Sequence, residues 1–417
     1  MKNLLSYPHE SQFSTTVSHI FVWSSLDWET KLFQYHYFFY KHILVIKLTF
    51  LILILCFSFN VLVAQSNEEK LMSIYTDFYS QNNLSAYSCG MGLTGIAGNN
   101  DISGITLNPA SICIKNKYEI ITEFSYKSGI NYYNIDGSEN YIRQIHPAVG
   151  IFFGYKINKK FQTGLSYRNG INLNGDFGEF SNINGVFDIS ESYYTHTLTI
   201  PFVYRTDIFS AGVNFNYIFY EGNFTGPQRF YADTIVNLKT TFGRIAPDFG
   251  IQINPINEIT IGLTYTQGFD KNIVREWSSV DHRLTNDTTL ARYPSKFGIG
   301  IQARLLENLL KIEINYRFEN TSKAIELNNR NNFNFGLDFS INNNWNIRTG
   351  FFTQLFGHEN NTVSVGFKQN YDQYFITFGT GYTFKFFKIN LSFMNSSLLS
   401  ESKAAHSEFN FGIGSSF

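Results

Sequence analysis

The sequence predicts an all-β protein, a transmembrane antiparallel β-barrel of about 14 strands with an N-terminal plug inside its lumen. Three observations predict this fold. Many segments alternate strictly between apolar and polar side chains over about ten residues. The connections between these segments are alternately short and long. One glycine-rich stretch ahead of the first segment shows no alternation, and it is the candidate plug.

The composition supports one large β domain. The 417 residues include 43 Phe and 26 Tyr but only 8 Pro, which is too aromatic and too regular for a disordered chain. Lys and Arg together number 32, Asp and Glu number 33, and no basic cluster stands out along the sequence. We therefore expect no nucleic-acid partner, because neutralising phosphates requires clustered Lys and Arg.

The first part of the chain contains a targeting signal. Lys41 and Lys47 precede an apolar run over residues 48–64, and polar residues follow it. This order predicts a secretory signal peptide over residues 41–64, with an uncleaved anchor helix as the alternative. Residues 1–40 lie upstream of that signal and are left unassigned; a mis-set translation start would explain them.

The candidate plug covers residues 84–113 within a periplasmic segment, residues 65–117. Its glycines permit tight turns and close approach of two backbones, and its side chains are mostly small. Asn108-Pro109-Ala110 sets one fixed bend before the first strand. Such a segment can fold compactly inside a barrel.

Residues 118–417 are expected to form the barrel. Between residues 310 and 318 the apolar side chains share one face, while Lys311, Glu313, Asn315 and Arg317 share the other. One face of such a strand suits lipid and the other suits a wet lumen. A soluble sandwich also alternates, but its strands usually have about five or six residues. The expected strands are 118–128, 144–156, 160–172, 193–205, 208–221, 240–253, 258–269, 293–304, 309–318, 331–341, 345–356, 373–384, 386–396 and 407–417.

The connections orient the barrel, because outer-membrane barrels have short periplasmic turns and longer extracellular loops. Residues 361–368 also alternate, but they are assigned to an extracellular loop because one more strand would make the number odd. The expected periplasmic turns are 157–160, 206–207, 254–257, 305–308 and 342–344, and the expected extracellular loops are 128–144, 173–192, 222–239, 270–292 and 319–330.

The sequence motifs indicate no enzyme, no cofactor and no metal site. HExxH, CxxC and GxSxG do not occur, and the His residues after the signal are scattered. Gly90 to Gly95 matches GxGxxG, but the preceding strand and following helix that a nucleotide site requires are not predicted. A hydrolase site assembled from distant strands is the alternative.

Two cysteines stand near the two ends of the plug. Cys89 and Cys113 could pair in an oxidising compartment, or both could remain thiols. A disulfide closing a loop of about 25 residues would contribute roughly 3 kcal/mol of stability in the chain-entropy model.

Charged side chains are expected to face the lumen as well. Most of them should neutralise one another across neighbouring strands. A remaining cation among Arg244, Lys311 and Arg317 could hold the carboxylate headgroup of a ligand.

The plug sequence resembles the FadL/TodX family of long-chain fatty acid outer-membrane transporters. The resemblance rests on the glycine run, on Asn-Asp-Ile-Ser at residues 100–103 and on Leu-Asn-Pro-Ala at residues 107–110. Tyr293-Pro294 resembles the proline-led strand of that family. The alternating C-terminus that ends in Phe417 looks like the last-strand signal of bacterial barrels, which implies recognition by the barrel assembly machinery.

The resemblance implies a function. It predicts a bacterial outer-membrane channel for passive uptake of hydrophobic small molecules, such as long-chain fatty acids or aromatic hydrocarbons, closed by the plug until the plug moves. The expected partners are the hydrophobic ligand and outer-membrane lipid. A FadL-like barrel that binds cargo in type IX protein secretion is the alternative, and a general porin is a weaker one.

The resemblance also implies a gate. In that family the Asn-Pro-Ala end of the plug lies beside a wall strand whose deformation opens a sideways exit, and the corresponding strand here is 160–172. Gly170 favours a bulge in it. We expect Asn108 to present its amide to the backbone groups that the bulge leaves unpaired, although the bend at Pro109 could simply launch the first strand.

Overall fold

The computed structural model describes residues 84–98, 101–135, 138–182, 185–228, 231–279, 286–320, 329–355, 373–399 and 405–417. The chain divides into two compact units, residues 1–66 and 67–417, and all described residues belong to the second. The expected signal peptide, the N-terminal extension and the alternating segment 361–368 lie outside the described residues.

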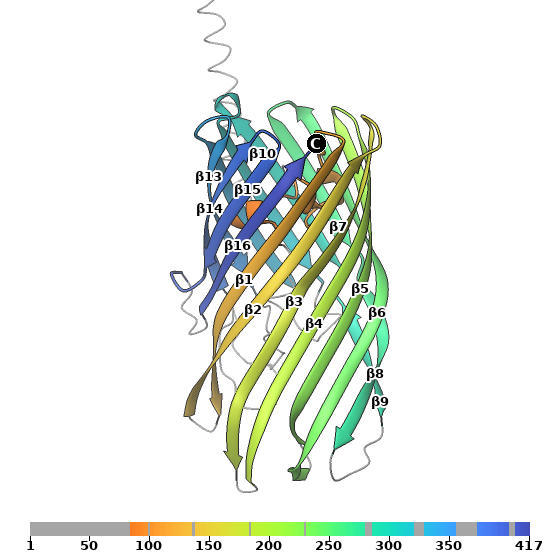
Figure 1. Cartoon of the computed structure of the whole chain (residues 1–417), viewed down its shortest axis with the longest axis vertical. Coiled ribbons are helices and arrows are strands. Elements are labelled where there is room, and N and C mark those ends of the chain that lie inside the picture. The colour runs from red at the N-terminus through yellow and green to blue at the C-terminus, as the bar shows by residue number, and fades with distance from the viewer. Residues whose placement is uncertain are drawn as a thin grey trace, which may run out of the picture. The chain divides into compact units, whose positions relative to one another are not determined.

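The described chain forms a closed antiparallel barrel of 14 strands, which confirms the predicted fold class (Figure 1). Neighbouring strands follow the chain order, β5 pairs with β6, and β16 pairs with β1 to close the ring. The strands of the ring are β1 (Tyr118–Ile135), β2 (Ser138–Lys156), β3 (Phe161–Asn182), β4 (Gly185–Arg205), β5 (Phe209–Gln228), β6 (Tyr231–Ile256), β7 (Ile259–Thr266), β10 (Lys296–Leu305), β11 (Leu310–Glu319), β12 (Arg330–Ser340), β13 (Trp345–Gln354), β14 (Gln373–Phe384), β15 (Phe387–Asn395) and β16 (Ala405–Ser416).

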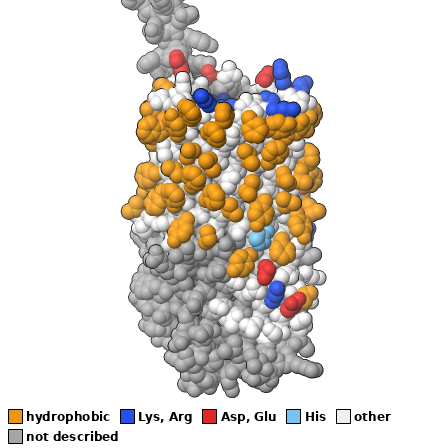
Figure 2. Space-filling model, viewed as in Figure 1, with side chains coloured by type: hydrophobic (Ala, Val, Ile, Leu, Met, Phe, Trp, Pro, Cys, Tyr) orange, Lys and Arg blue, Asp and Glu red, His pale blue; other side chains and the backbone are white. Residues whose placement is uncertain are grey.

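The outer surface carries a belt of apolar side chains (Figure 2). On β6, Ile245 is 64% exposed, whereas Gln252, on the opposite face, is 5% exposed. An apolar outer face on a closed antiparallel barrel is the structure of an outer-membrane protein, so the predicted localisation is confirmed. Among the described residues, no helix is long and apolar enough to span a membrane.

Several expected extracellular loops are strands instead. β1 and β2 pair without interruption as far as Ile135 and Ser138, and β3 and β4 pair as far as Asn182 and Gly185. These hairpins therefore extend through most of the residues that were assigned to the two loops. Our loop boundaries were wrong because the alternation of apolar and polar residues in the sequence weakens along these segments, although backbone pairing continues through them.

A second hairpin, β8 (Phe269–Ser279) and β9 (Asp287–Tyr293), adds to the wall outside the ring. β8 pairs with residues 236–240 of β6, while β7 pairs with β6 from Asp248 onward. The two ladders leave residues 241–247 between them. Phe242, Ala246 and Phe269 form an apolar cluster at this place, supported by Ile218 and Tyr220.

The plug consists of three short helical turns before β1. They are α3 (Ala86–Gly90), η1 (Ile102–Thr106) and η2 (Pro109–Ser111). α3 contacts β13 to β16, η1 contacts β1 and β2, and η2 contacts β4 to β6. Because one segment reaches strands on several sides of a closed ring, it lies inside the lumen, as the sequence predicted.

The C-terminal strand completes the ring. The Phe417 N–H donates to the Tyr118 carbonyl at 3.0 Å, and the Tyr118 N–H donates back to Phe417 at 2.8 Å. The closing role of this strand is thus confirmed, while its recognition by the barrel assembly machinery stays a prediction.

The two faces of a strand predict different costs for the same substitution. Leu263 lies on the outward face of β7 and Thr264 on its inward face, beside Gly298 of β10. An arginine facing mid-bilayer lipid costs about 2–4 kcal/mol. Leu263→Arg should therefore impair refolding into lipid vesicles more than Thr264→Arg. Equal losses of refolding yield would contradict the assigned faces.

Candidate functional site

The plug lies against glycines that point inward from the wall. A Cβ added at Gly212 of β5 would stand 2.6 Å from the Pro109 carbonyl carbon, and one at Gly379 of β14 would stand 2.8 Å from Gly90 Cα. Neither contact can be made by a real side chain. The inward glycines at which an added Cβ would meet the plug in this way include Gly212, Gly250, Gly262, Gly300, Gly336, Gly350 and Gly379. At these positions the plug backbone fills the space that the side chain of any other wall residue would occupy.

Wall carboxylates accept hydrogen bonds from the plug backbone. Glu123 of β1 accepts from the Ala86 N–H at 3.1 Å, at the first residue of α3. One oxygen of Glu313 accepts from both Gly95 and Ala97, at 2.7 and 3.0 Å. These N–H groups belong to plug backbone outside the strands, where few backbone carbonyls are available as partners. The wall carboxylates therefore supply the hydrogen-bond acceptors that regular secondary structure would otherwise supply.

Other wall side chains complete the polar contacts. The Ile102 N–H donates to Glu119, and the Ile114 N–H donates to Gln162. The plug carbonyls accept in turn from amide, guanidinium and hydroxyl groups of the wall. The pairs, with the donor first, are Asn334 to Gly92, Arg317 to Leu93, Gln252 to Ala97, Asn214 to Ile105, and both Arg205 and Ser210 to Ala110.

One plug side chain reaches a buried charge cluster on the wall. The Tyr87 hydroxyl donates to Asp338 of β12 at 3.1 Å. Asp338 also pairs with Lys311 at 3.2 Å and Arg348 at 3.4 Å. The Arg348 guanidinium lies 4.3 Å from the centre of the Tyr87 ring, a cation–π contact. This cluster fixes α3 against the β11 to β13 wall.

A second ionic contact fixes η1. Lys388 of β15 pairs with Asp101 at 2.5 Å, and Asp101 also accepts from Ser103. Burial opposes ionisation of Asp101, but Lys388 and the Ser103 hydrogen bonds outweigh it and lower the pKa of the carboxyl. Because the pKa in the folded protein lies below its ordinary value, the pair contributes its stability at neutral pH. That contribution is lost as the pH falls through the lowered pKa.

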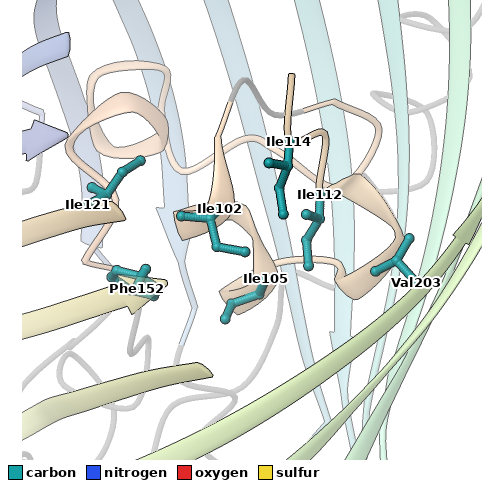
Figure 3. Packing of buried hydrophobic residues seen from close by; sticks show 7 residues of the cluster. All are labelled: Ile102, Ile105, Ile112, Ile114, Ile121, Phe152 and Val203. Atoms are coloured by element: carbon teal, nitrogen blue, oxygen red, sulfur yellow. The ribbon is translucent and has the colours of Figure 1, made fainter. Parts of the chain in front are cut away.

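An apolar cluster joins the plug to the strands on one side of the barrel (Figure 3). The plug contributes Ile102, Ile105, Ile112 and Ile114. The wall contributes Ile121 of β1, Phe152 of β2 and Val203 of β4. All seven side chains are nearly or completely buried, so they exclude water from this side of the plug.

The Asn108-Pro109-Ala110 bend lies elsewhere than expected. The Asn108 amide donates to the Ile96 carbonyl at 2.7 Å and, at longer range, to Ile251 of β6 and Leu263 of β7. Its oxygen accepts from the Ala110 N–H at 2.9 Å and caps η2. The expected contact between Asn108 and the bulge in β3 was therefore wrong, because the register of the barrel places this bend on β5 to β7. A gating role for these residues stays a prediction.

The cationic side chains that the sequence suggested for headgroup binding contact other groups of the protein. Arg317 donates to the plug carbonyl of Leu93 at 2.6 Å, and Lys311 pairs with Asp338. The Arg244 guanidinium lies 4.2 Å from the centre of the Phe269 ring. Arg317 and Lys311 thus stabilise the plug and the wall, and only Arg244 lies away from the plug contacts described above.

The two cysteines are thiols in the structure, so the disulfide that the sequence allowed is not formed. Cys89 is buried in α3, and Cys113 is partly exposed. Burial raises the pKa of the Cys89 thiol well above its ordinary value, which makes it a poor nucleophile while the plug is in place.

The expected bulge in β3 is confirmed. β3 pairs with β4 through Asn169↔His196 and then Ile171↔Thr195, so Gly170 is an extra residue. A second extra residue, Phe177, stands farther along the same strand. Each bulge bends the strand and locally increases its twist.

The wall opens beside this bulge. β2 and β3 pair only from Lys156↔Gln162 to Val149↔Asn169, although both strands continue. Beyond that point, within the described part of the chain, β2 pairs only with β1, and β3 pairs only with β4 (Figure 1). We call this break, between residues 138–148 of β2 and 170–182 of β3, the β2–β3 separation.

The separation begins at the level of the plug. A Cβ on Gly150 of β2 would lie 3.1 Å from Cδ1 of Leu84, the first described plug residue. On the same side of the plug, away from the short turns, the inner wall carries the cluster around Phe242 and Phe269. The lumen on this side of the plug thus has apolar surface on β5, β6 and β8.

Sequence reasoning identified the plug and the bulge but not the groups that hold the plug. The signal was present in the alternating strands, where glycines and carboxylates repeatedly occupy the inward positions. Gly212, Gly336 and Glu313 belong to this pattern. Their partners lie on a distant segment, so a strand pattern alone could not show what they contact.

Comparison with solved structures gives barrels of the same fold. A FadL homologue of Pseudomonas aeruginosa has a TM-score of 0.61 at 14% identity, over 79% of this chain and 97% of that one. The toluene transporter TbuX of Ralstonia pickettii has a TM-score of 0.60 at 14% identity, over 81% and 98%. The toluene transporter TodX of Pseudomonas putida has a TM-score of 0.58 at 12% identity, over 79% and 97%.

These likenesses confirm the predicted resemblance to FadL and TodX at the level of the fold. No family model and no curated protein matches the sequence. The comparisons do not support the alternative function in type IX secretion better than they support a channel for hydrophobic substrates.

The glycine contacts predict that a single methyl group can unseat the plug. In Gly212→Ala the new Cβ would collide with Pro109 and with the Ala110 nitrogen, 2.7 Å away. We expect this variant to leak ions in planar bilayers. Ala211→Val, which enlarges the outward face of the same strand, should leave the conductance unchanged. A tight Gly212→Ala barrel would contradict the close fit.

The carboxylate contacts predict the accessibility of Cys89. In a Cys113→Ser background, Glu123→Ala leaves the buried Ala86 N–H without its acceptor, which costs about 1–3 kcal/mol. Labelling of Cys89 by a maleimide should become roughly fivefold faster or more. Glu319→Ala removes a carboxylate that pairs only with wall residues and serves as the control. Equal labelling rates in the two variants would show that Glu123 does not anchor α3.

Proposed function

We propose that this protein is an outer-membrane channel for passive uptake of hydrophobic small molecules, such as long-chain fatty acids or aromatic hydrocarbons. In this proposal the plug closes the lumen toward the periplasm, and the ligand leaves sideways through the β2–β3 separation. The observation that carries the proposal is the end of the β2–β3 ladder at Val149 and Asn169, at the level of the plug.

The plug favours a sideways path. A hydrophobic molecule moving straight through would have to break the buried hydrogen bonds to Glu123 and Glu313 and offer nothing in return. Leaving through the wall takes it from apolar lumen to bilayer, where it stays out of water. The likeness in fold to two toluene transporters and a FadL homologue supports this class of substrate.

Gly170 and the Asn108-Pro109-Ala110 bend have complementary roles in this proposal. The extra residue in β3 turns the strand away from β2 and keeps the separation open. The bend holds another edge of the plug against β5 and β6, where Gly212 and Gly250 admit it. Opening is thereby confined to one side of the barrel.

Deletion of single bulge residues tests the proposal. Without Gly170, Asn169 and Ile171 become neighbours opposite His196 and Thr195, and regular pairing is restored. We expect cells that carry this variant to lose uptake of both oleate and toluene, down to the level of cells without the barrel, at matched surface abundance.

Deletion of Phe177 is the matched control. It removes the other extra residue of the same strand, farther from the plug, and should preserve uptake. The sideways path would be refuted by full uptake after deletion of Gly170. Loss of uptake after both deletions would equally contradict the assignment of the exit to Gly170.

A further inference from the structure

The periplasmic rim of the barrel carries a basic patch beyond the features used above. We define the basic rim as Lys115, Lys117, Lys156, Lys159 and Lys160. These residues lie at the start of β1, the end of β2 and the turn into β3. The Lys156 N–H donates to the Lys117 carbonyl and its ammonium group donates to the Lys115 carbonyl, so the three strand ends are adjacent. The patch is assembled by folding, which is why the charge balance of the sequence did not indicate it.

Within the described part of the chain, no ion pair includes any of the five ammonium groups. Lys115 interacts with Glu119 only at longer range, and the Lys117 ammonium lies over the Tyr118 ring. Four are exposed, and Lys156 is partly exposed. Other turns of this rim carry exposed acidic side chains, Asp207 between β4 and β5 and Glu307 between β10 and β11. The five lysines gather at the adjoining ends of β1, β2 and β3, while Figure 2 shows that charged side chains of both signs line this rim as a whole.

The depth of the basic rim identifies its partner. Directly beside it lies a group of aromatic rings. The Tyr118 ring stacks on Tyr155 with 5.3 Å between the ring centres, and it lies tilted against Phe417 at 5.7 Å. Phe161 and Tyr204 continue this group at 5.2 Å. Aromatic belts of this kind lie at the level of lipid headgroups. The lysines thus stand where the phosphates of the periplasmic leaflet lie.

We propose that the basic rim binds the headgroup of an anionic phospholipid, with its acyl chains against the aromatic group and the apolar belt. Clustered lysines beside a membrane bind anionic lipids, and each contributes a factor of about five in affinity. The site is independent of the transport path, since it lies at the opposite end of β2 and β3 from the separation.

Native mass spectrometry of the full barrel tests this proposal. The protein is presented with equal amounts of phosphatidylglycerol and phosphatidylcholine in mixed micelles. We expect selective retention of phosphatidylglycerol. Lys159→Gln/Lys160→Gln should weaken that retention by roughly tenfold or more, whereas Lys159→Arg/Lys160→Arg should preserve it. Lys239→Gln, which removes one exposed positive charge on β6 away from the rim, should have no effect.

Four results would overturn the proposal. The first is equal retention of the two lipids, and the second is unchanged retention in Lys159→Gln/Lys160→Gln. The third is displacement of phosphatidylglycerol by inorganic phosphate at equal concentration, which would indicate a site for free anions. The fourth is preferential binding of polyglutamate, which would indicate an acidic protein as the partner.

Discussion

The structure depends on one constraint, which is that a plug without regular secondary structure must have its backbone polar groups satisfied inside a closed barrel. The wall meets this constraint in two ways. Inward glycines such as Gly212 let the two backbones approach, and inward side chains such as Glu313 accept or donate hydrogen bonds. Both devices weaken the wall considered alone, because glycine destabilises strands and buried carboxylates are costly. They are stable only together with the plug.

Because of the same constraint, polar and apolar side chains occupy different parts of the lumen. Most inward charges that could have held a ligand headgroup are engaged by the plug or by one another, as Arg317 and Lys311 show. Apolar surface remains around Phe242 and Phe269, on the side of the plug where the β2–β3 ladder ends. In the proposed path, a hydrophobic molecule would pass from that space, above the hydrogen-bonded plug, to the interrupted β2–β3 ladder.

Much of this fold could be predicted from the sequence because the decisive signals are local. Strict alternation gives the strands, their faces and, with the turns, the number in the ring, as Ile245 and Gln252 illustrate. The bulge at Gly170 was also predictable, because a glycine within a strand pattern weakens regular pairing.

The site itself depends on contacts between distant residues. Tyr87 and Asp338 are 251 positions apart, and no local pattern pairs them. The same holds for Asn108, which was expected beside β3 and lies against β6 and β7 because barrel closure and strand register fix its position. The lengths of the long hairpins were missed because backbone pairing continues there although the sequence no longer alternates regularly between apolar and polar residues.

The central claim is that the plug stays in place while the ligand leaves through the wall. A covalent bridge between plug and wall tests it most directly. Asp101 of the plug and Lys388 of β15 pair directly, so cysteines at these two positions would lie within reach of a short bismaleimide. In a Cys89→Ser/Cys113→Ser background, Asp101→Cys/Lys388→Cys should take up toluene equally well after bridging by the bismaleimide and after capping of both thiols by N-ethylmaleimide. Uptake that is lost on bridging but kept on capping would show that the plug must move, and would contradict the account.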